Sequence, residues 1–108
     1  MPDQNVDVSY DPNGNPVWTI SDPEVEMTEA GKIIFHRKPA NATWTFVRIN
    51  GIPSDWSQGA QGANYQVDDP HDPLGSWAYT ITINYDGTEV TGPELLAKAD
   101  PPPIIMNE

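Results

Sequence analysis

Large apolar and smaller, mostly polar residues alternate without a break from residue 75 to residue 85 (GSWAYTITINY). This period of two, in a segment rich in aromatic and β-branched residues, predicts a strand with one buried face. The buried face is expected to consist of Trp77, Tyr79, Ile81, Ile83 and Tyr85. Side chains of this size need a second layer to cover them, so the segment predicts packed β-structure.

Shorter stretches of the same kind recur along the chain, separated by turn residues. The strands are expected at residues 6–10, 17–20, 25–27, 32–36, 43–49, 65–67 and 88–90. Asp86-Gly87 predicts a hairpin turn, because both residue types tolerate positive φ. Residues 50–62 (NGIPSDWSQGAQG) are expected to be irregular. Near the C-terminus, residues 93–98 are expected to form a short strand or one helical turn, and residues 104–106 to pair along a sheet edge.

The twelve prolines oppose a helical interpretation. A proline inside a helix costs about 3 kcal/mol. Short strands joined by turns at this spacing predict an all-β fold, a two-sheet antiparallel sandwich, with a small barrel as the alternative. The length of 108 residues predicts one domain over residues 1–108, with a proline-rich tail from about residue 100 that is either flexible or docked.

The net charge of −11, with only five lysines and arginines, narrows the classes of partner. A field of this sign repels nucleic acid and anionic membranes, so neither is expected as a partner. The chain has no cysteine, which excludes disulfides and thiolate metal sites. Its first residues lack the basic and apolar regions of a secretory signal, which predicts a cytoplasmic location unless a leader has been removed.

Two stretches resemble the cupredoxin pattern. Residues 23–27 and 30–35 (PEVEM and AGKIIF) resemble that fold's paired strands around an Ala-Gly turn. Residues 75–79 (GSWAY) resemble its late Gly-x-aromatic-x-aromatic strand. Copper-binding members carry a cysteine soon after that strand, where this chain has Ile81. The resemblance therefore implies the fold, while type 1 copper is excluded.

The whole chain also resembles the DP-EP family of small bacterial β-sandwich proteins. The similar elements are Ser21-Asp22-Pro23 before the Gly31 hairpin, the strand that begins at Gly75, and the ending Asp100-Pro101 with residues 103–107 (PIIMN). The resemblance implies a cupredoxin-like or immunoglobulin-like sandwich of unassigned biochemical role. It supplies no catalytic residues.

An acidic, proline-containing loop at residues 68–73 is the most chemically distinctive feature. Calcium takes six to eight oxygen ligands, and Asp68, Asp69 and Asp72 could supply several of them. The spacing differs from an EF-hand, which needs a glycine and a closing glutamate. The alternative interpretation is that the Asp-Pro pairs form turns with solvated carboxylates.

His36 and His71 are the only histidines. Together with an aspartate they could hold zinc or copper, or act as an acid and a base. Because they lie far apart in the sequence, packing and solvation roles are favoured. No nucleophile elbow frames a serine, so no enzymatic activity is expected.

Trp56 and Tyr65 border the irregular stretch. An aromatic ring on a polar, glycine-rich loop could stack on a sugar or anchor a protein interface. The alternative is that Trp56 folds back and closes the end of the sandwich.

These observations favour a small acidic non-enzymatic module that binds or assembles through loops or sheet edges. Its partner would be a protein, a carbohydrate or a second copy paired through edge strands. The alternative function is calcium binding by the aspartates of the 68–72 loop.

Overall fold

The structure is a computed structural model that describes residues 3–14, 17–92 and 103–108. The strands in these ranges are β1 (Gln4–Tyr10), β2 (Trp18–Ile20), β3 (Glu24–Met27), β4 (Gly31–Lys38), β5 (Thr45–Asn50), β6 (Gln58–Gln61), β7 (Asn64–Asp69), β8 (Gly75–Ala78), β9 (Thr80–Tyr85), β10 (Thr88–Gly92) and β11 (Ile104–Asn107). Within the described residues, no helix is long and apolar enough to cross a bilayer. The predicted all-β class is confirmed.

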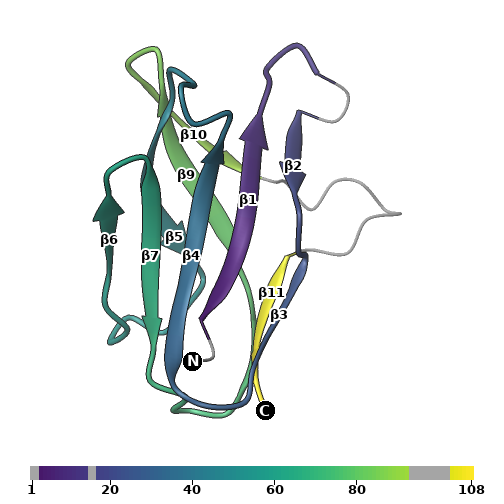
Figure 1. The fold of residues 1–108 in the computed structure, drawn as a ribbon, viewed down its shortest axis with the longest axis vertical. Coiled ribbons are helices and arrows are strands. Elements are labelled where there is room, and N and C mark those ends of the chain that lie inside the picture. Colours follow the sequence, from purple (N-terminus) through teal and green to yellow (C-terminus); the bar gives the residue numbers. More distant parts are fainter. Residues whose placement is uncertain (1–2, 15–16, 93–102) are drawn as a thin grey trace.

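The strands form one large sheet and two small ones. The large sheet has the order β2-β1-β4-β7-β6, and the small sheets have the orders β10-β9-β5 and β3-β11-β8. Figure 1 shows β1, β4 and β7 side by side, with β9 passing behind them. Aromatic pairs join the layers: the ring centroids of Phe35 and Tyr79 lie 5.6 Å apart, and those of Phe46 and Tyr65 lie 5.9 Å apart.

The predicted sandwich is confirmed, with two differences in detail. One layer is divided between two three-stranded sheets, where a single sheet was expected. The pairs β1/β4 and β3/β11 are parallel, whereas an antiparallel arrangement was expected throughout. The alternation of side chains reports which face of a strand is buried and is the same for both pairings.

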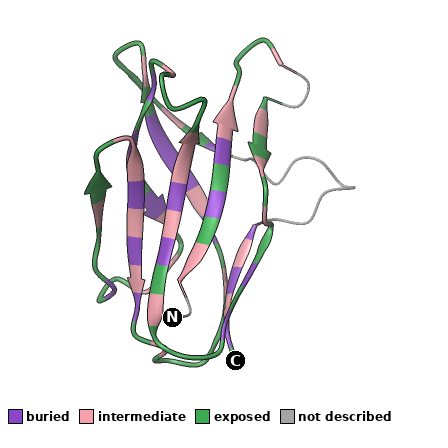
Figure 2. Ribbon diagram, in the orientation of Figure 1, coloured by how far each residue is buried: buried purple, intermediate pink, exposed green. Residues whose placement is uncertain are grey.

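The core lies between the layers, and its residues follow the predicted alternation (Figure 2). Its buried side chains are Val6, Val8, Val25, Met27, Ile33, Phe35, Trp44, Phe46, Ile49, Trp56, Tyr65, Val67, Tyr79, Ile81, Ile83 and Ile105. They come from both the large sheet and the small sheets, so the described residues share one core.

The segment of residues 75–85 keeps its predicted faces but is divided at Tyr79. Before Tyr79, β8 pairs with β11, and after it, β9 pairs with β5 and β10. One polar position also differs from the expectation, because Thr82 is buried at 1% exposure. Its hydroxyl is hydrogen-bonded to Asn50 and Thr91, which satisfies the buried oxygen.

The Asp86-Gly87 hairpin is confirmed. Its two turn residues have φ values of 51° and 79°. Positive φ at both central positions matches the twist of the flanking strands, which here are β9 and β10.

The prediction that residues 50–62 are irregular was wrong in part, because this stretch contains β6, which pairs with β7. The pairing expected for residues 104–106 is present in β11, but this strand lies in the middle of its sheet between β3 and β8 and not along an edge. The element predicted for residues 93–98 lies outside the described residues.

Candidate functional site

Each sheet has two edge strands, and several of these carry features that block pairing with another protein. β3 exposes Glu24 and Glu26, and β10 exposes Glu89. β5 has a register shift between Phe46 and Arg48. Charges and bulges of this kind are the usual protection of an exposed sheet edge.

The edge of β5 is also closed by a side chain. The main-chain N–H of Ile49 donates to Gln58 Oε1 at 2.9 Å, and Gln58 Nε2 donates to the Ile49 carbonyl at 3.2 Å. The Tyr65 hydroxyl donates to the same Oε1 atom at 2.7 Å. The Gln58 amide thus occupies the hydrogen-bonding position of a neighbouring strand.

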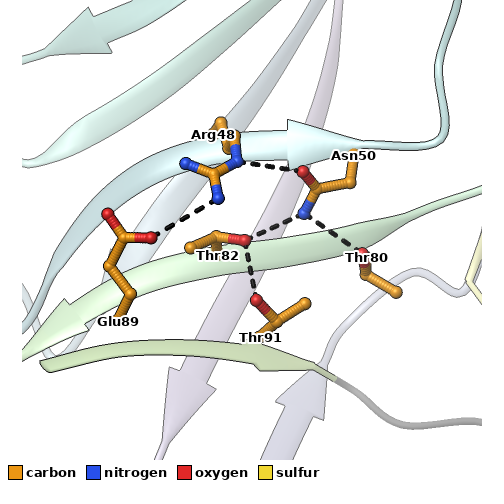
Figure 3. A network of polar contacts seen from close by, with 6 residues as sticks. All are labelled: Arg48, Asn50, Thr80, Thr82, Glu89 and Thr91. Carbon is orange, nitrogen blue, oxygen red and sulfur yellow. Dashed lines mark hydrogen bonds and ion pairs between the residues drawn. The ribbon is translucent and has the colours of Figure 1, made fainter.

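The small sheet of β5, β9 and β10 carries a polar network, which Figure 3 shows. Its members are Arg48, Asn50, Thr80, Thr82, Glu89 and Thr91. Asn50 Nδ2 donates to two threonine hydroxyls, and Arg48 contacts Glu89 at 3.4 Å. These side chains bond to one another, and the Arg48 and Glu89 side chains remain half exposed.

β8, like β2 and β6, is an edge strand that has neither a charge nor a bulge. Its sequence is Gly-Ser-Trp-Ala, and Gly75, Ser76 and Ala78 are exposed. Among the described residues, only β11 pairs with it. Gly51 approaches the carbonyl oxygen of Ala78, so the open part of the edge ends before that residue.

Leu74 stands immediately before β8 with 65% of its surface exposed. It is the most exposed large hydrophobic side chain of the described residues. An exposed leucine beside an unprotected strand edge combines an apolar contact with free main-chain groups. We therefore treat Leu74 and the residues of β8 up to Trp77 as the candidate site.

Hydrogen bonds to the core and to neighbouring strands hold the loop that presents Leu74. The indole N–H of Trp56 donates to the Asp72 carbonyl at 3.3 Å. Asn107 Nδ2 donates to the Pro73 carbonyl at 3.0 Å, and the His71 main-chain N–H donates to Asp69 Oδ1 at 2.8 Å. These contacts fix the shape of the loop, and a surface that is already ordered loses less entropy when it binds.

His71 ties the loop to two other segments. Its backbone has a φ of 62°, and its Nε2 lies 3.1 Å from the Met27 carbonyl and 2.7 Å from the main-chain oxygen of Glu108. Both neighbours are acceptors, so Nε2 must carry a proton and donate. The imidazole is thus a structural link between the loop, β3 and the end of β11.

Asp69 and Asn107 form a buried polar pair beneath the loop. They are 2% and 3% exposed, and Asn107 Nδ2 donates to Asp69 Oδ1 at 2.9 Å. Within the described part of the chain, Asp69 Oδ2 and Asn107 Oδ1 have no hydrogen-bond partner. The sequence carries a signal for the burial of both residues. Asp69 lies two positions after the inward-facing Val67, and Asn107 lies two positions after the inward-facing Ile105, so each is on the core face of its strand.

Comparisons with family models and with curated proteins found no match. The resemblances to cupredoxins and to the DP-EP family therefore stay predictions.

The structure places the two predicted aromatic residues in the core. Trp56 and Tyr65 are each 4% exposed, so neither presents a ring face to solvent. Trp56 packs edge-on against Trp77 with 5.1 Å between ring centroids, which agrees with the interpretation that it closes one end of the sandwich. Burial raises the pKa of Tyr65, and the positive charge of Arg48 opposes this shift.

The three aspartates predicted to hold calcium do not converge. Asp68 and Asp69 are consecutive residues of β7, so their side chains leave opposite faces of the strand. Asp68 accepts a hydrogen bond from Gln66 Nε2 at 3.0 Å, and Asp72 lies in the exposed loop. The described residues contain no group of three acidic, histidine or cysteine side chains able to hold a metal ion.

The two histidines serve separate structural contacts. His36 Nε2 lies 2.8 Å from Asn5 Oδ1 between β4 and β1, and His71 bonds to the main-chain oxygens described above. In the part of the chain that the structure describes, neither histidine is hydrogen-bonded to a serine hydroxyl, an arrangement that would activate a nucleophile. An open depression of about 360 Å³ lies between Lys32, Asp55 and Pro70, and neither histidine lines it.

Proposed function

We propose that this protein is a small non-enzymatic binding module that adds an extended segment of a partner protein to the open edge of β8. The proposal rests on the exposure of Leu74, 65%, at the start of an uncharged strand that has one open edge among the described residues. Edges of this kind are templates for strand addition. The fixed loop beneath Leu74 supports the same interpretation.

Two interactions would contribute to the affinity. The main-chain N–H and C=O of Ser76 would pair with the partner segment, because the register turns those of Gly75 and Trp77 toward β11. Leu74 would supply an apolar anchor, because complete burial of a leucine is worth about 1.5–3 kcal/mol and most of this side chain is still in water.

The charge of the protein indicates the chemistry of the partner segment. A net charge of −11 attracts cationic segments and repels anionic ones. We therefore expect the bound segment to be β-prone and flanked by lysine or arginine, with an association rate that falls as salt is added.

Selection of binders from a random peptide library tests the proposal, because it samples extended segments of every sequence type. Selected peptides should shift the amide resonances of residues 74–77, and Leu74→Asp should weaken their binding at least tenfold. Ala60→Asp is the matched control, because it places the same charge on β6, the other uncharged four-residue edge. Peptides that bind equally well to both variants, or that shift a different surface, would refute the proposal.

A further inference from the structure

The last strand of the structure, β11, is held on both of its edges. Residues 104–107 pair with β3 in parallel and with β8 in antiparallel orientation. Figure 1 shows β11 running beside β3 at the C-terminal end of the chain. β3 and β8 therefore form the two walls of a slot that holds an extended peptide; we call it the β3/β8 slot.

Main-chain hydrogen bonds follow the peptide along the whole slot. Beyond the strand ladders, Ile104 N–H donates to the Pro23 carbonyl at 2.8 Å, and Glu108 N–H donates to the Met27 carbonyl at 2.9 Å. On the other side, Tyr79 N–H donates to the Pro103 carbonyl at 3.0 Å. Residues 103–108 are thus bound at both ends and along both edges.

The slot also recognises side chains at alternate positions. Ile105 is completely buried in the core. Asn107 donates to Asp69 Oδ1 at 2.9 Å and to the Pro73 carbonyl at 3.0 Å. Ile104 and Met106, on the other face, are half-buried. The slot therefore selects a strand with an apolar residue followed two positions later by an amide.

We propose that the β3/β8 slot accepts residues 103–108 of a second copy of this chain, so that two copies exchange β11 reciprocally and form a dimer. The chain's own segment is the peptide that the structure shows in the slot, and a second copy offers the same groups. Ten residues separate Gly92 from Pro103. A segment of this length can span up to about 35 Å when extended. Exchange of an identical element is a low-cost route to a dimer, because each copy keeps the contacts it had.

The charge sets the conditions under which the dimer forms. Two copies of net charge −11 repel each other, so salt and high protein concentration should favour exchange. The exchange uses the inner edge of β8, whereas the proposed function uses its outer edge. The two proposals can therefore fail independently.

Engineered disulfides test the exchange, since the chain has no cysteine of its own. Ser76 and Met106 lie directly opposite each other on β8 and β11. Such residues have Cβ atoms about 5 Å apart, which a small adjustment brings within disulfide range. Ser76→Cys and Met106→Cys are prepared as separate proteins, mixed, unfolded, refolded together at high concentration and salt, and oxidised.

The expected product is a covalent heterodimer in which peptide mapping finds residue 76 joined to residue 106. Asn84→Cys replaces Ser76→Cys in the control mixture, because Asn84 is exposed on β9 and opposite β10. The exchange predicts several times more heterodimer than the control gives. An equal yield would overturn it, provided that the double variant in one chain closes its internal disulfide.

A second measurement needs no disulfide. The unmodified protein, refolded at high concentration and salt, should contain a dimer that light scattering detects and that separates only slowly on dilution. A monomer at every concentration and salt tested would overturn the proposal.

In the disulfide experiment, bonds that join residue 76 to residue 76 would indicate pairing of the outer edges of β8 and would also count against exchange.

Discussion

Replacing Tyr79 by phenylalanine tests how a single buried oxygen atom affects the stability of the sandwich. Tyr79 is 1% exposed, and its ring packs edge-on against Phe35. Within the described residues, its hydroxyl has no hydrogen-bond partner. The substitution Tyr79→Phe removes that oxygen and leaves the ring in place.

The expected effect at neutral pH is a gain in stability. A buried hydroxyl without a partner costs about 1–3 kcal/mol relative to water. Removing one oxygen leaves a void of about 10 Å³, which costs about 0.2 kcal/mol at about 24 cal/mol per Å³. The net gain in the free energy of unfolding is therefore on the order of 1 kcal/mol, which corresponds to a rise in Tm of about 4–8 °C.

Tyr65→Phe is the matched control. The Tyr65 hydroxyl donates to Gln58 Oε1 at 2.7 Å, so its removal loses a formed hydrogen bond and should lower stability by about 1 kcal/mol. Urea unfolding of the three proteins measures both effects. A loss of stability in Tyr79→Phe as large as in the control would refute the assignment of an unpartnered hydroxyl.

Alkaline pH gives an independent readout of the same group. Burial, and secondarily the negative charge of Asp22, raise the pKa of Tyr79 well above its ordinary value of 10.0. The contribution of neutral Tyr79 to the free energy of unfolding is fully present below about pH 10, because tyrosine is neutral there in both the folded and the unfolded state. As the pH rises further, the unfolded state releases its proton first and stability falls by up to about 1.4 kcal/mol per pH unit. The advantage of Tyr79→Phe should therefore grow above about pH 10, and an advantage that stays constant would contradict the raised pKa.

Three further predictions concern the backbone, an edge and the loop. Gly51→Ala should lower the free energy of unfolding by at least about 2 kcal/mol in thermal melts, because φ is 91° there and a Cβ would overlap the Ala78 carbonyl. Gly62→Ala, where φ is 63° and the space is open, should lower it by only about 1 kcal/mol. Gln58→Ala should lower the free energy of unfolding in urea by about 2–3 kcal/mol, because it leaves the main chain of β5 and the buried Tyr65 hydroxyl without partners. Gln61→Ala, at an exposed position of β6, should have no effect. Melting curves in excess calcium and in chelator should coincide at constant ionic strength, whereas a site saturated a hundredfold above its Kd would add about 2.7 kcal/mol.

The amino-acid pattern predicted which faces are buried better than which strands are neighbours. Tyr79, Ile81 and Ile83 are buried as the alternation required. The same alternation continues through Tyr79 without interruption, although the pairing changes there from β11 to β5. A period of two is identical in parallel, antiparallel, edge and central strands, so the central position of β11 could not be read from it.

The candidate site illustrates a second limit. The acidic loop was interpreted as one cluster because Asp68 and Asp69 are adjacent in sequence, yet adjacency in a strand separates their side chains onto opposite faces. Asp69 instead bonds to Asn107, whose distance of 38 positions along the chain no local pattern spans. The exposure of Leu74 was missed for a related reason, because an apolar residue between Pro73 and Gly75 has no periodic context.

β8 connects the two proposals through Asn107. This side chain sits in the β3/β8 slot as part of β11, and it also holds the Pro73 carbonyl in the loop that presents Leu74. The shape of the outer site therefore depends on which residues occupy the inner slot. An exchanged dimer supplies Asn107 from the second copy and leaves the loop unchanged, so exchange and partner binding at Leu74 are compatible in one assembly. Asn107→Ala keeps the main-chain pairing of β11 but releases the Pro73 carbonyl next to Leu74, and it should weaken peptide binding at Leu74 more than it reduces the yield of exchanged dimer.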